Sequence, residues 1–207
     1  MTPIILSFDT LIFVSVVNTT LLAPVVNIDY WITALLAALW VMLPAYIPNP
    51  AAVILGGGMP IDGGRVHPDG NRLLGNGKTV RGLLLGILAG VLAGGVQLSL
   101  QTNAFPAFLP RHTLLTVLML ATGALAGDLV KSYFKRRKGI PQGRRWPVAD
   151  QYDLVLGALV LTLVAAPAWV MANLTVPVLL WILVLTPVLH RAANLLGHSL
   201  GVKDVPW

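Results

Sequence analysis

The sequence predicts an all-α integral membrane protein, and two observations carry this prediction: how few charges the chain contains and where they are missing. Of its 207 residues, 56% are hydrophobic and only 11% are charged, and the mean hydropathy is +0.79. Soluble domains carry roughly 25% charged residues. A deficit of this size means that much of the protein surface faces lipid instead of water.

Long segments without Asp, Glu, Lys or Arg mark the core helices. A membrane-spanning helix needs about 20 apolar residues, and charge-free segments of suitable length are separated by two polar loops. We therefore predict a bundle of five core transmembrane helices, over residues 30–48, 82–101, 112–131, 154–172 and 176–195.

Proline and glycine indicate how these helices end and pack. Prolines crowd the end of the first helix and mark the connection between the second and the third, and residues 172–177 form a tight turn between the last two. Glycine recurs at every fourth position of the second helix, at Gly82, Gly86, Gly90 and Gly94. Such a smooth face favours close helix packing; a substrate groove along the same face is the alternative.

The segment 4–26 precedes the core helices and is apolar enough to span a membrane, although it contains Asp9 and Pro24. No Lys or Arg precedes it, which argues against a cleaved signal peptide. A further transmembrane helix and a half-inserted or surface segment both fit this composition. We divide the chain into an apolar N-terminal extension, 1–29, and a single transmembrane domain, 30–207.

The basic residues predict the orientation of the bundle. Of the 14 Lys and Arg, all but Arg111 fall in the loop 49–81, in the segment 131–153 or beyond residue 190. Because cytoplasmic loops collect Lys and Arg, we expect both polar loops and the C-terminus in the cytoplasm of a multi-pass cell-membrane protein. The net charge of +6 is explained in the same way and needs no nucleic-acid partner.

The inner end of the third helix carries the first group of residues suited to chemistry. The spacing of Asp128, Lys131, Ser132 and Lys135 places their side chains on one helix face. Lysines that reach toward the membrane surface from a helix end are ordinary, and neutralisation of the carboxylate by these lysines is one interpretation. A carboxylate inside a membrane is costly, however, and points to function.

A second group of acidic residues lies at the start of the fourth helix, where Asp150 and Asp153 follow Pro147. The chain contains no Cys, which excludes thiolate catalysis, and no Glu, so these are two of only eight carboxylate side chains. A single aspartate would be explained by the helix dipole. Two facing carboxylates repel each other unless a cation or a proton lies between them, and magnesium bound by carboxylates and substrate phosphates is the usual solution.

The loop before the second helix combines glycines with Arg65, Lys78 and Thr79. Glycine lets a backbone approach a ligand, and basic side chains bind phosphate. The string GNGKT resembles the end of a Walker motif, but Arg72 stands where that motif requires its first glycine and no strand precedes it, which excludes a P-loop nucleotidase. A loop that contacts lipid headgroups is the alternative.

Basic and polar residues also share a face at the inner end of the last helix, where His190, Arg191 and Asn194 offer either a phosphate contact or a membrane anchor. Taken together, the four groups supply carboxylates for a metal, cations for phosphates and glycine-rich backbone at one membrane face. Phosphoryl or nucleotidyl transfer needs this inventory. A transporter or channel for an anionic metabolite is the alternative function, but the outer halves of the helices lack charge and no inverted repeat is visible.

The same residues resemble the CTP-dependent phosphatidate cytidylyltransferases. The run from Gly127 to Ile140 is similar to their GDL…S…KR…GI segment, and Pro147 with Asp150 and Asp153 resembles the tail of their PGHGG…DR.D signature, whose HGG portion is absent here. The closer resemblance is to the archaeal branch, the CDP-archaeol synthases, over about residues 33–207. It rests on the strings LPAYIPNPAAVILGGGMPID, RLLGNGKTVRG, GDLVKSYFKRRKGI, DQYDLVLGAL and VKDVPW.

This resemblance implies a specific reaction and site. CMP would pass from CTP to the phosphate of an isoprenoid ether lipid, unsaturated archaetidic acid, with magnesium as cofactor and pyrophosphate as second product. The metal would be bound by Asp128, Asp150 and Asp153, which are also catalytic with Lys78 and Lys135. The nucleotide would contact Gly57, Gly58, Lys78, Thr79, Lys131, Ser132 and Lys135. The lipid phosphate would contact Asn49, Arg65, His190 and Arg191. Membrane lipids are further partners, and the oligomeric state is left open.

Overall fold

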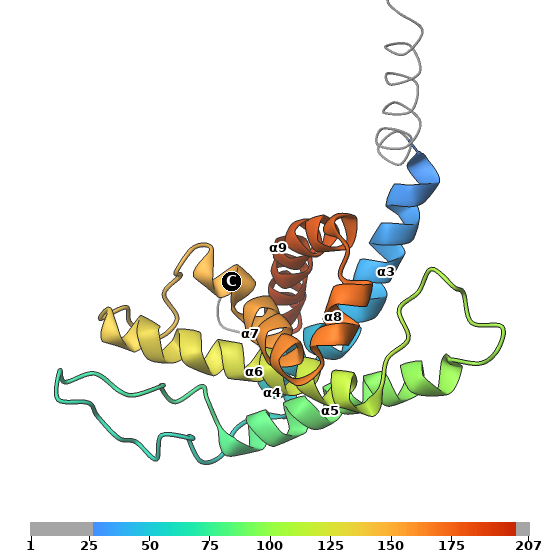
Figure 1. Cartoon of the computed structure of the whole chain (residues 1–207). Coiled ribbons are helices and arrows are strands. Elements are labelled where there is room, and N and C mark those ends of the chain that lie inside the picture. The colour runs from blue at the N-terminus through green and yellow to red at the C-terminus, as the bar shows by residue number, and fades with distance from the viewer. Residues whose placement is uncertain (1–26, 202–207) are drawn as a thin grey trace, which may run out of the picture.

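The computed structural model describes residues 27–201, and this part of the chain consists of helices and loops, with two isolated β-bridges and no strand (Figure 1). The expected membrane segment over residues 4–26 lies outside the described residues. The described helices are α3 (Ile28–Tyr46), α4 (Pro48–Leu55), α5 (Val80–Leu100), α6 (Leu114–Arg137), α7 (Ala149–Ala165), α8 (Pro167–Asn173) and α9 (Val176–Ser199).

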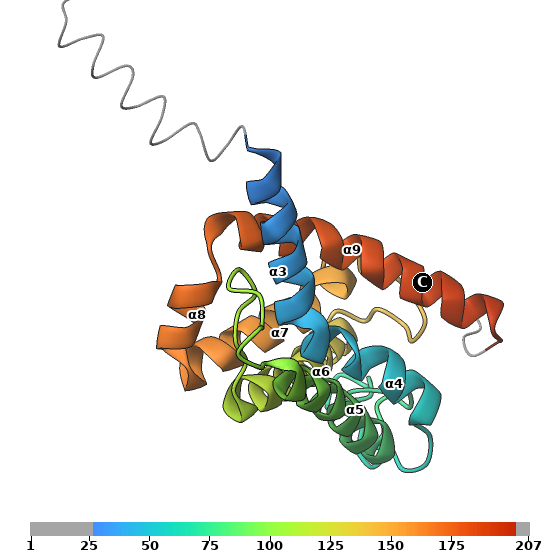
Figure 2. The same cartoon turned by 90° about the vertical axis from the view of Figure 1, so that its right-hand side faces the viewer.

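The prediction of an all-α membrane protein is confirmed. By length and composition, four stretches of the described chain can cross a membrane, namely α3 with α4, α5, α6 and α9, and the bent pair α7 and α8 is a fifth candidate. The first predicted helix is continued by α4, which packs against α5 (Figure 2).

The prediction of one continuous helix over residues 154–172 is wrong. The helix begins earlier, at Ala149, and breaks at Ala166, after which α8 runs at 120° to α7. Pro167 causes this break, because proline has no backbone N–H to continue the helix and disfavours helical geometry in the residue before it. Ala166 accordingly has φ −142° and ψ 59°.

Helix α5 has one face for packing and one for lipid. Its glycines at positions 82, 86, 90 and 94 are buried, whereas Leu84, Leu88 and Leu92 are exposed. A Cβ atom added to Gly90 would lie 2.6 Å from the carbonyl oxygen of Pro44 and 2.9 Å from the Cβ atom of Ala121. The packing interpretation of the glycine repeat is therefore confirmed. Glycines similarly bring α6 and α7 together, with a Cβ on Gly123 placed 2.6 Å from the Gly157 oxygen.

Two prolines inside helices free a carbonyl group, and in each case a side chain from another helix donates to it. A proline cannot donate to the carbonyl four residues earlier. Pro44 in α3 thus frees the Trp40 oxygen, which accepts from Gln97 Nε2 at 2.7 Å. Pro187 in α9 frees the Leu183 oxygen, which accepts from the Tyr152 hydroxyl at 3.0 Å. Both helices are thereby fastened to their neighbours at the proline.

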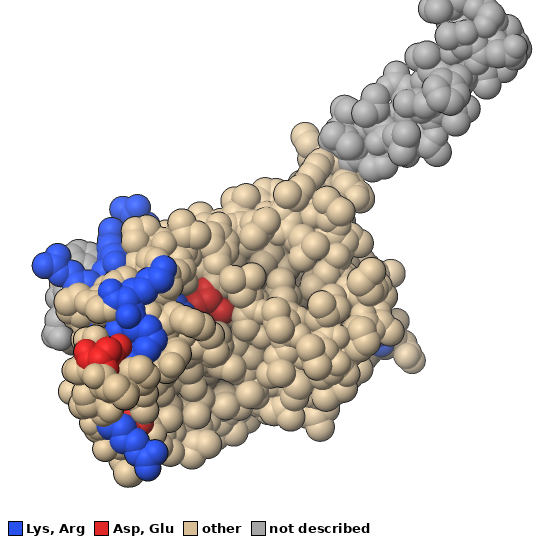
Figure 3. All heavy atoms as spheres, turned by 60° about the vertical axis from the view of Figure 1, so that its left-hand side comes forward, with Lys and Arg blue, Asp and Glu red and all other residues tan. Residues whose placement is uncertain are grey.

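Most charged side chains in Figure 3 gather at one end of the molecule, next to a broad surface that is almost free of charge. This end, which we call the charged end, is formed by the loop between α4 and α5, the last turns of α6 and the loop leading to α7. The separation of charged from apolar surface is the one expected for a membrane protein whose polar loops lie on one side.

Candidate active site

A cavity of about 650 Å³ opens at the charged end. Its walls come from α4, from the loop that precedes α5, from the C-terminal end of α6, from the start of α7 and from α9. Segments far apart in the sequence therefore present polar side chains to one space. Helices α4 and α9 contribute apolar residues to the cavity wall, among them Val53, Ile54, Leu189 and Leu196.

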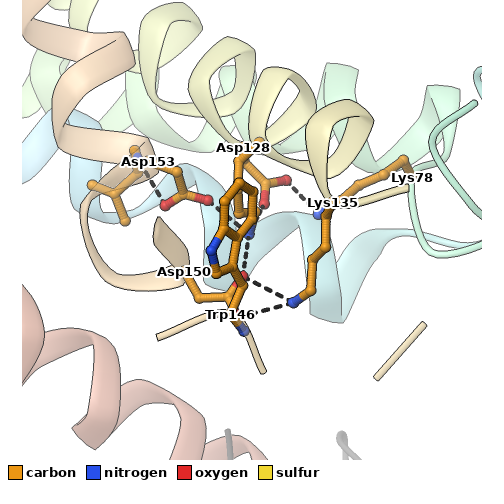
Figure 4. Close-up of polar contacts among 8 residues, drawn as sticks. Lys78, Asp128, Lys135, Trp146, Asp150 and Asp153 are labelled. Carbon is orange, nitrogen blue, oxygen red and sulfur yellow. Dashed lines mark hydrogen bonds and ion pairs between the residues drawn. The ribbon is translucent and has the colours of Figure 1, made fainter. Parts of the chain in front are cut away.

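Three carboxylates surround one ammonium group beside this cavity. Lys131 Nζ lies 3.1 Å from Asp128 Oδ1, 3.2 Å from Asp150 Oδ1 and 2.8 Å from Asp153 Oδ2. Figure 4 shows the three aspartates pointing toward one another from α6 and α7. Asp128 and Asp153 are buried, so the Lys131 ammonium offsets much of their negative charge. We call these four residues the Asp–Lys cluster.

Two further lysines extend the cluster toward the cavity opening. Lys78, in the loop before α5, forms an ion pair with Asp128. Lys135 Nζ donates to both oxygens of Asp150, at 3.0 and 2.9 Å (Figure 4). The spacing of Asp128, Lys131 and Lys135 along α6 places them on one face, as predicted from the helical period.

The start of α7 holds Asp150 in place through a tight turn. The Ala149 N–H donates to the Pro147 oxygen at 2.8 Å across Val148, whose φ of 69° and ψ of −58° define a γ-turn. A β-branched residue rarely adopts positive φ, and such strain is typical of functional sites. The Trp146 N–H, on the other side of the turn, donates to Asp150 Oδ2 at 2.6 Å.

The loop that carries Lys78 is organised around a buried aspartate, Asp62. Its carboxylate accepts from Arg72 at 2.5 and 3.3 Å and from the backbone N–H groups of Gly64, Leu74 and Gly75 at 3.0–3.1 Å. The hydrogen bond from Arg72, with the backbone donors, holds the pKa of Asp62 well below its usual range. The Lys78 carbonyl in turn accepts from the Ile61 N–H at 2.8 Å, which fixes the backbone of Lys78.

The tip of the same loop is tied to the end of α6. Arg137 donates to Asp69 Oδ2 at 2.8 Å and to the Arg72 carbonyl at 2.7 Å, and its guanidinium lies over the Tyr133 ring. Because α6 also carries Lys131 and Lys135, this contact couples the loop to the helix that presents the lysines.

The structure brings most of the predicted site residues together. Those that line the cavity are Asn49, Lys78, Thr79, Asp128, Lys131, Lys135, Asp150, His190 and Arg191. The Thr79 hydroxyl also caps α5, accepting from the Gly82 N–H at 3.1 Å. Asp153 lies behind the cavity and contacts it through Lys131.

Besides Asp153, four predicted residues are not among those that line the cavity, namely Gly57, Gly58, Arg65 and Ser132. The glycines have φ values of 92° and 78° and are exposed, so at these positions glycine allows turns in the loop. Ser132 is buried on α6, one position beyond Lys131.

Several residues that line the cavity were missed from the sequence. Arg144 and Arg145 follow Gly143 in the basic loop before α7, and Gln151 lies between the two aspartates of α7. Their closeness to Asp150 in the sequence was the signal that could have identified them as site residues. Tyr46 also lines the cavity, and its hydroxyl forms a hydrogen bond of 2.9 Å with the Thr186 hydroxyl of α9. No sequence pattern connects residues so far apart.

The three aspartates can bind magnesium only if phosphate oxygens of a substrate complete its coordination. Carboxylate oxygens are hard ligands of the kind magnesium prefers, at about 2.0–2.1 Å. Each aspartate oxygen lies about 3 Å from the shared ammonium, and no three His or Asp side chains in the described part of the chain are close enough to form a metal site by themselves. Magnesium bound by one or two carboxylates and completed by phosphate oxygens matches this arrangement.

Comparison with known proteins places these features in a family. The family model described as "CarS-like: CDP-archaeol synthase" matches residues 31–207. The CDP-archaeol synthase of Methanosphaerula palustris is 63% identical over 166 residues, which cover 80% of this chain and all of that protein. The CDP-archaeol synthase of Methanospirillum hungatei is 53% identical over the same share of each chain.

A solved structure described as an intramembrane enzyme for archaeal membrane lipid biosynthesis is similar in fold. It shares 36% sequence identity, covers 82% of this chain and 95% of its own, and superimposes with a TM-score of 0.60. At this identity and coverage, the two proteins share sequence as well as the arrangement of their helices.

Proposed function

Because this chain belongs to the CDP-archaeol synthase family, we propose that the Asp–Lys cluster and its cavity are the site at which it transfers CMP to a lipid phosphate. The protein is a membrane-bound, CTP-dependent nucleotidyltransferase that forms CDP-archaeol in archaeal lipid biosynthesis. Enzymes of this class are metal-dependent. The observation that supports the site is the meeting of three carboxylates and three lysines from the α5 loop, α6 and α7 beside one cavity.

The lysines serve the nucleotide in this proposal. CTP brings a triphosphate, and Lys78, Lys131 and Lys135 supply positive charge from two sides of the cluster. Magnesium, held by one or two of Asp128, Asp150 and Asp153 together with phosphate oxygens, would add neutralising charge where the pyrophosphate departs. The exchange is a direct displacement: an oxygen of the lipid phosphate bonds to the α-phosphorus, and the bond to the bridging oxygen of pyrophosphate breaks.

The lipid substrate enters from the α4 and α9 side. His190 and Arg191 line the cavity on α9, and an arginine fork suits a monoester phosphate. The apolar wall beside them, formed by α4 and α9 residues such as Val53, Ile54 and Leu196, suits isoprenoid chains. Asn49, at the start of α4, lies on the same wall.

The charged end faces the cytoplasm in this proposal, because Lys and Arg are concentrated there. CTP is then taken from the cytoplasm and the product is released into the inner leaflet. The alternative of an anion transporter gains no support from the family comparisons.

Sealed membrane vesicles of opposite orientation test function and sidedness together. CTP labelled in its α-phosphate is added outside vesicles that contain the protein and archaeal lipid phosphate. Inside-out vesicles are expected to incorporate the label into lipid, whereas right-side-out vesicles leave it in CTP; label in the γ-phosphate stays in the aqueous phase in both. Incorporation only by right-side-out vesicles would reverse the orientation. Label that enters the vesicle lumen without joining lipid would support transport.

A further inference from the structure

The proline in α9 divides that helix into two parts that have different neighbours. Pro187 lacks the N–H that would bond to the Leu183 carbonyl. The part before the proline packs in the bundle core, where Ile182 is buried. The part after it carries His190 and Arg191, which line the cavity. How the helix is held at Pro187 therefore determines where these two side chains lie.

Two tyrosines from other helices bond to α9 in the turn that precedes Pro187. The Tyr152 hydroxyl, from α7, donates to the freed Leu183 oxygen at 3.0 Å. The Tyr46 hydroxyl, from α3, pairs with the Thr186 hydroxyl at 2.9 Å, and Thr186 donates to the Ile182 carbonyl at 2.6 Å. The two contacts fasten α9 to separate helices within one turn of Pro187.

The position of Tyr152 in the sequence links this contact to the carboxylates. Tyr152 immediately precedes Asp153 and lies two residues after Asp150 on α7. Both aspartates pair with Lys131 in the Asp–Lys cluster. Tyr152 of α7 thus bonds to the α9 backbone, while Asp150, two residues before it, and Asp153, directly after it, belong to the proposed metal site.

We infer that Tyr152 is a positioning residue, whose hydrogen bond to the Leu183 carbonyl sets the distance between the carboxylates of α7 and the lipid-phosphate side chains of α9. The inference rests on the proposed function, because it assigns those two sets of residues to the two substrates. Group transfer requires the attacking oxygen to be aligned with the α-phosphorus, and small misplacements are costly. Tyr152 itself does not line the cavity.

Replacing Tyr152 by Phe removes the hydroxyl and keeps the ring. We expect a roughly three- to tenfold loss of kcat/KM for the lipid phosphate, the size expected for one interhelical hydrogen bond that controls alignment. The affinity for CTP, measured by calorimetry without lipid, is expected to equal that of the wild type. Steady-state kinetics with lipid phosphate varied at saturating CTP measures the first quantity.

The matched control is the equivalent hydrogen bond in α3. Gln97 donates to the Trp40 carbonyl that Pro44 frees, and neither Gln97 nor Trp40 lines the cavity. Gln97→Met is expected to lower the Tm without changing kcat/KM for the lipid. An equal kinetic loss in Gln97→Met would mean that Tyr152 acts only through general stability, and the inference would be wrong.

A second variant, Pro187→Ala, tests the inference even if Tyr152→Phe alone lowers the stability of the protein. Pro187→Ala restores an N–H that can bond to the Leu183 carbonyl, so Tyr152→Phe is expected to add little further loss in that background. Fully additive losses would show that the two residues act independently and would overturn the inference. Failure of the proposed function is distinguishable, because the wild type would then form no CDP-lipid, whereas failure of this inference leaves the wild type active and Tyr152→Phe unimpaired.

Discussion

Replacing Asp153 by Asn is expected to lower turnover by roughly a hundredfold or more, because the loss of this proposed metal ligand would remove several kcal/mol of transition-state stabilisation. Asp153 is buried and paired with Lys131 at 2.8 Å. A neutral amide of nearly the same size keeps the packing and removes the charge. Asp150→Asn is expected to lose a similar amount, with an added structural cost because Asp150 also accepts from the Trp146 N–H.

Turnover at limiting magnesium, together with the Tm of each variant, measures this effect. Asp29→Asn is the matched control, since Asp29 lies in the first turn of α3 and does not line the cavity. Near-native turnover of both Asp150→Asn and Asp153→Asn at limiting magnesium would refute the metal assignment. A loss that tracked the Tm alone would assign the carboxylates to folding.

The second large effect separates the two substrates. Lys78→Ala and Lys135→Ala are each expected to weaken CTP binding roughly ten- to hundredfold, as for the loss of a hydrogen bond to a charged group. Arg191→Ala is expected to leave CTP affinity almost unchanged and to raise the KM for lipid phosphate. The reason is location: the lysines contact Asp128 and Asp150, whereas Arg191 lies on α9 beside the apolar wall of the cavity.

Calorimetric titration of CTP with magnesium into each variant, in the absence of lipid, distinguishes the roles. Arg144→Ala is a useful comparison, because Arg144 also lines the cavity but lies in the loop before α7. Native-like CTP affinity in Lys78→Ala, or its loss in Arg191→Ala, would mean that the cations are assigned to the wrong substrates.

The helices were predictable from the sequence because lipid imposes a simple rule on composition. Charge-free segments long enough to cross a bilayer identified α5 and α9, and a shorter one at residues 112–127 identified α6, whose end lies six residues beyond the predicted one. The same rule concealed the break at Ala166, since apolar composition continues smoothly through it. Only the stereochemistry of Pro167 reveals that α7 ends there.

The candidate site was predictable within one helix but only partly between helices. The helical period places Asp128, Lys131 and Lys135 together without further information. Their meeting with Lys78 depends on a loop folded around the buried Asp62, whose partners lie up to 13 residues away. The turn at Val148 has no local signature either, because valine rarely adopts positive φ.

Contacts across the bundle lie beyond sequence reasoning for the same reason. That Pro187 frees a carbonyl follows from its chemistry, but that Tyr152 donates to it depends on how α7 and α9 pack. The pairing of Arg137 with Asp69 joins residues 68 positions apart. Such contacts are set by tertiary packing, which periodicity and spacing do not contain.

The magnesium dependence of CTP affinity tests the central claim most directly, namely that the Asp–Lys cluster is the metal-dependent nucleotide site. CTP is titrated by calorimetry at increasing magnesium concentrations into the wild type, Asp128→Asn and Asp29→Asn. The wild type and Asp29→Asn are expected to bind CTP more tightly as magnesium rises, whereas Asp128→Asn shows little such change. A magnesium dependence in Asp128→Asn equal to that of the wild type would contradict the account.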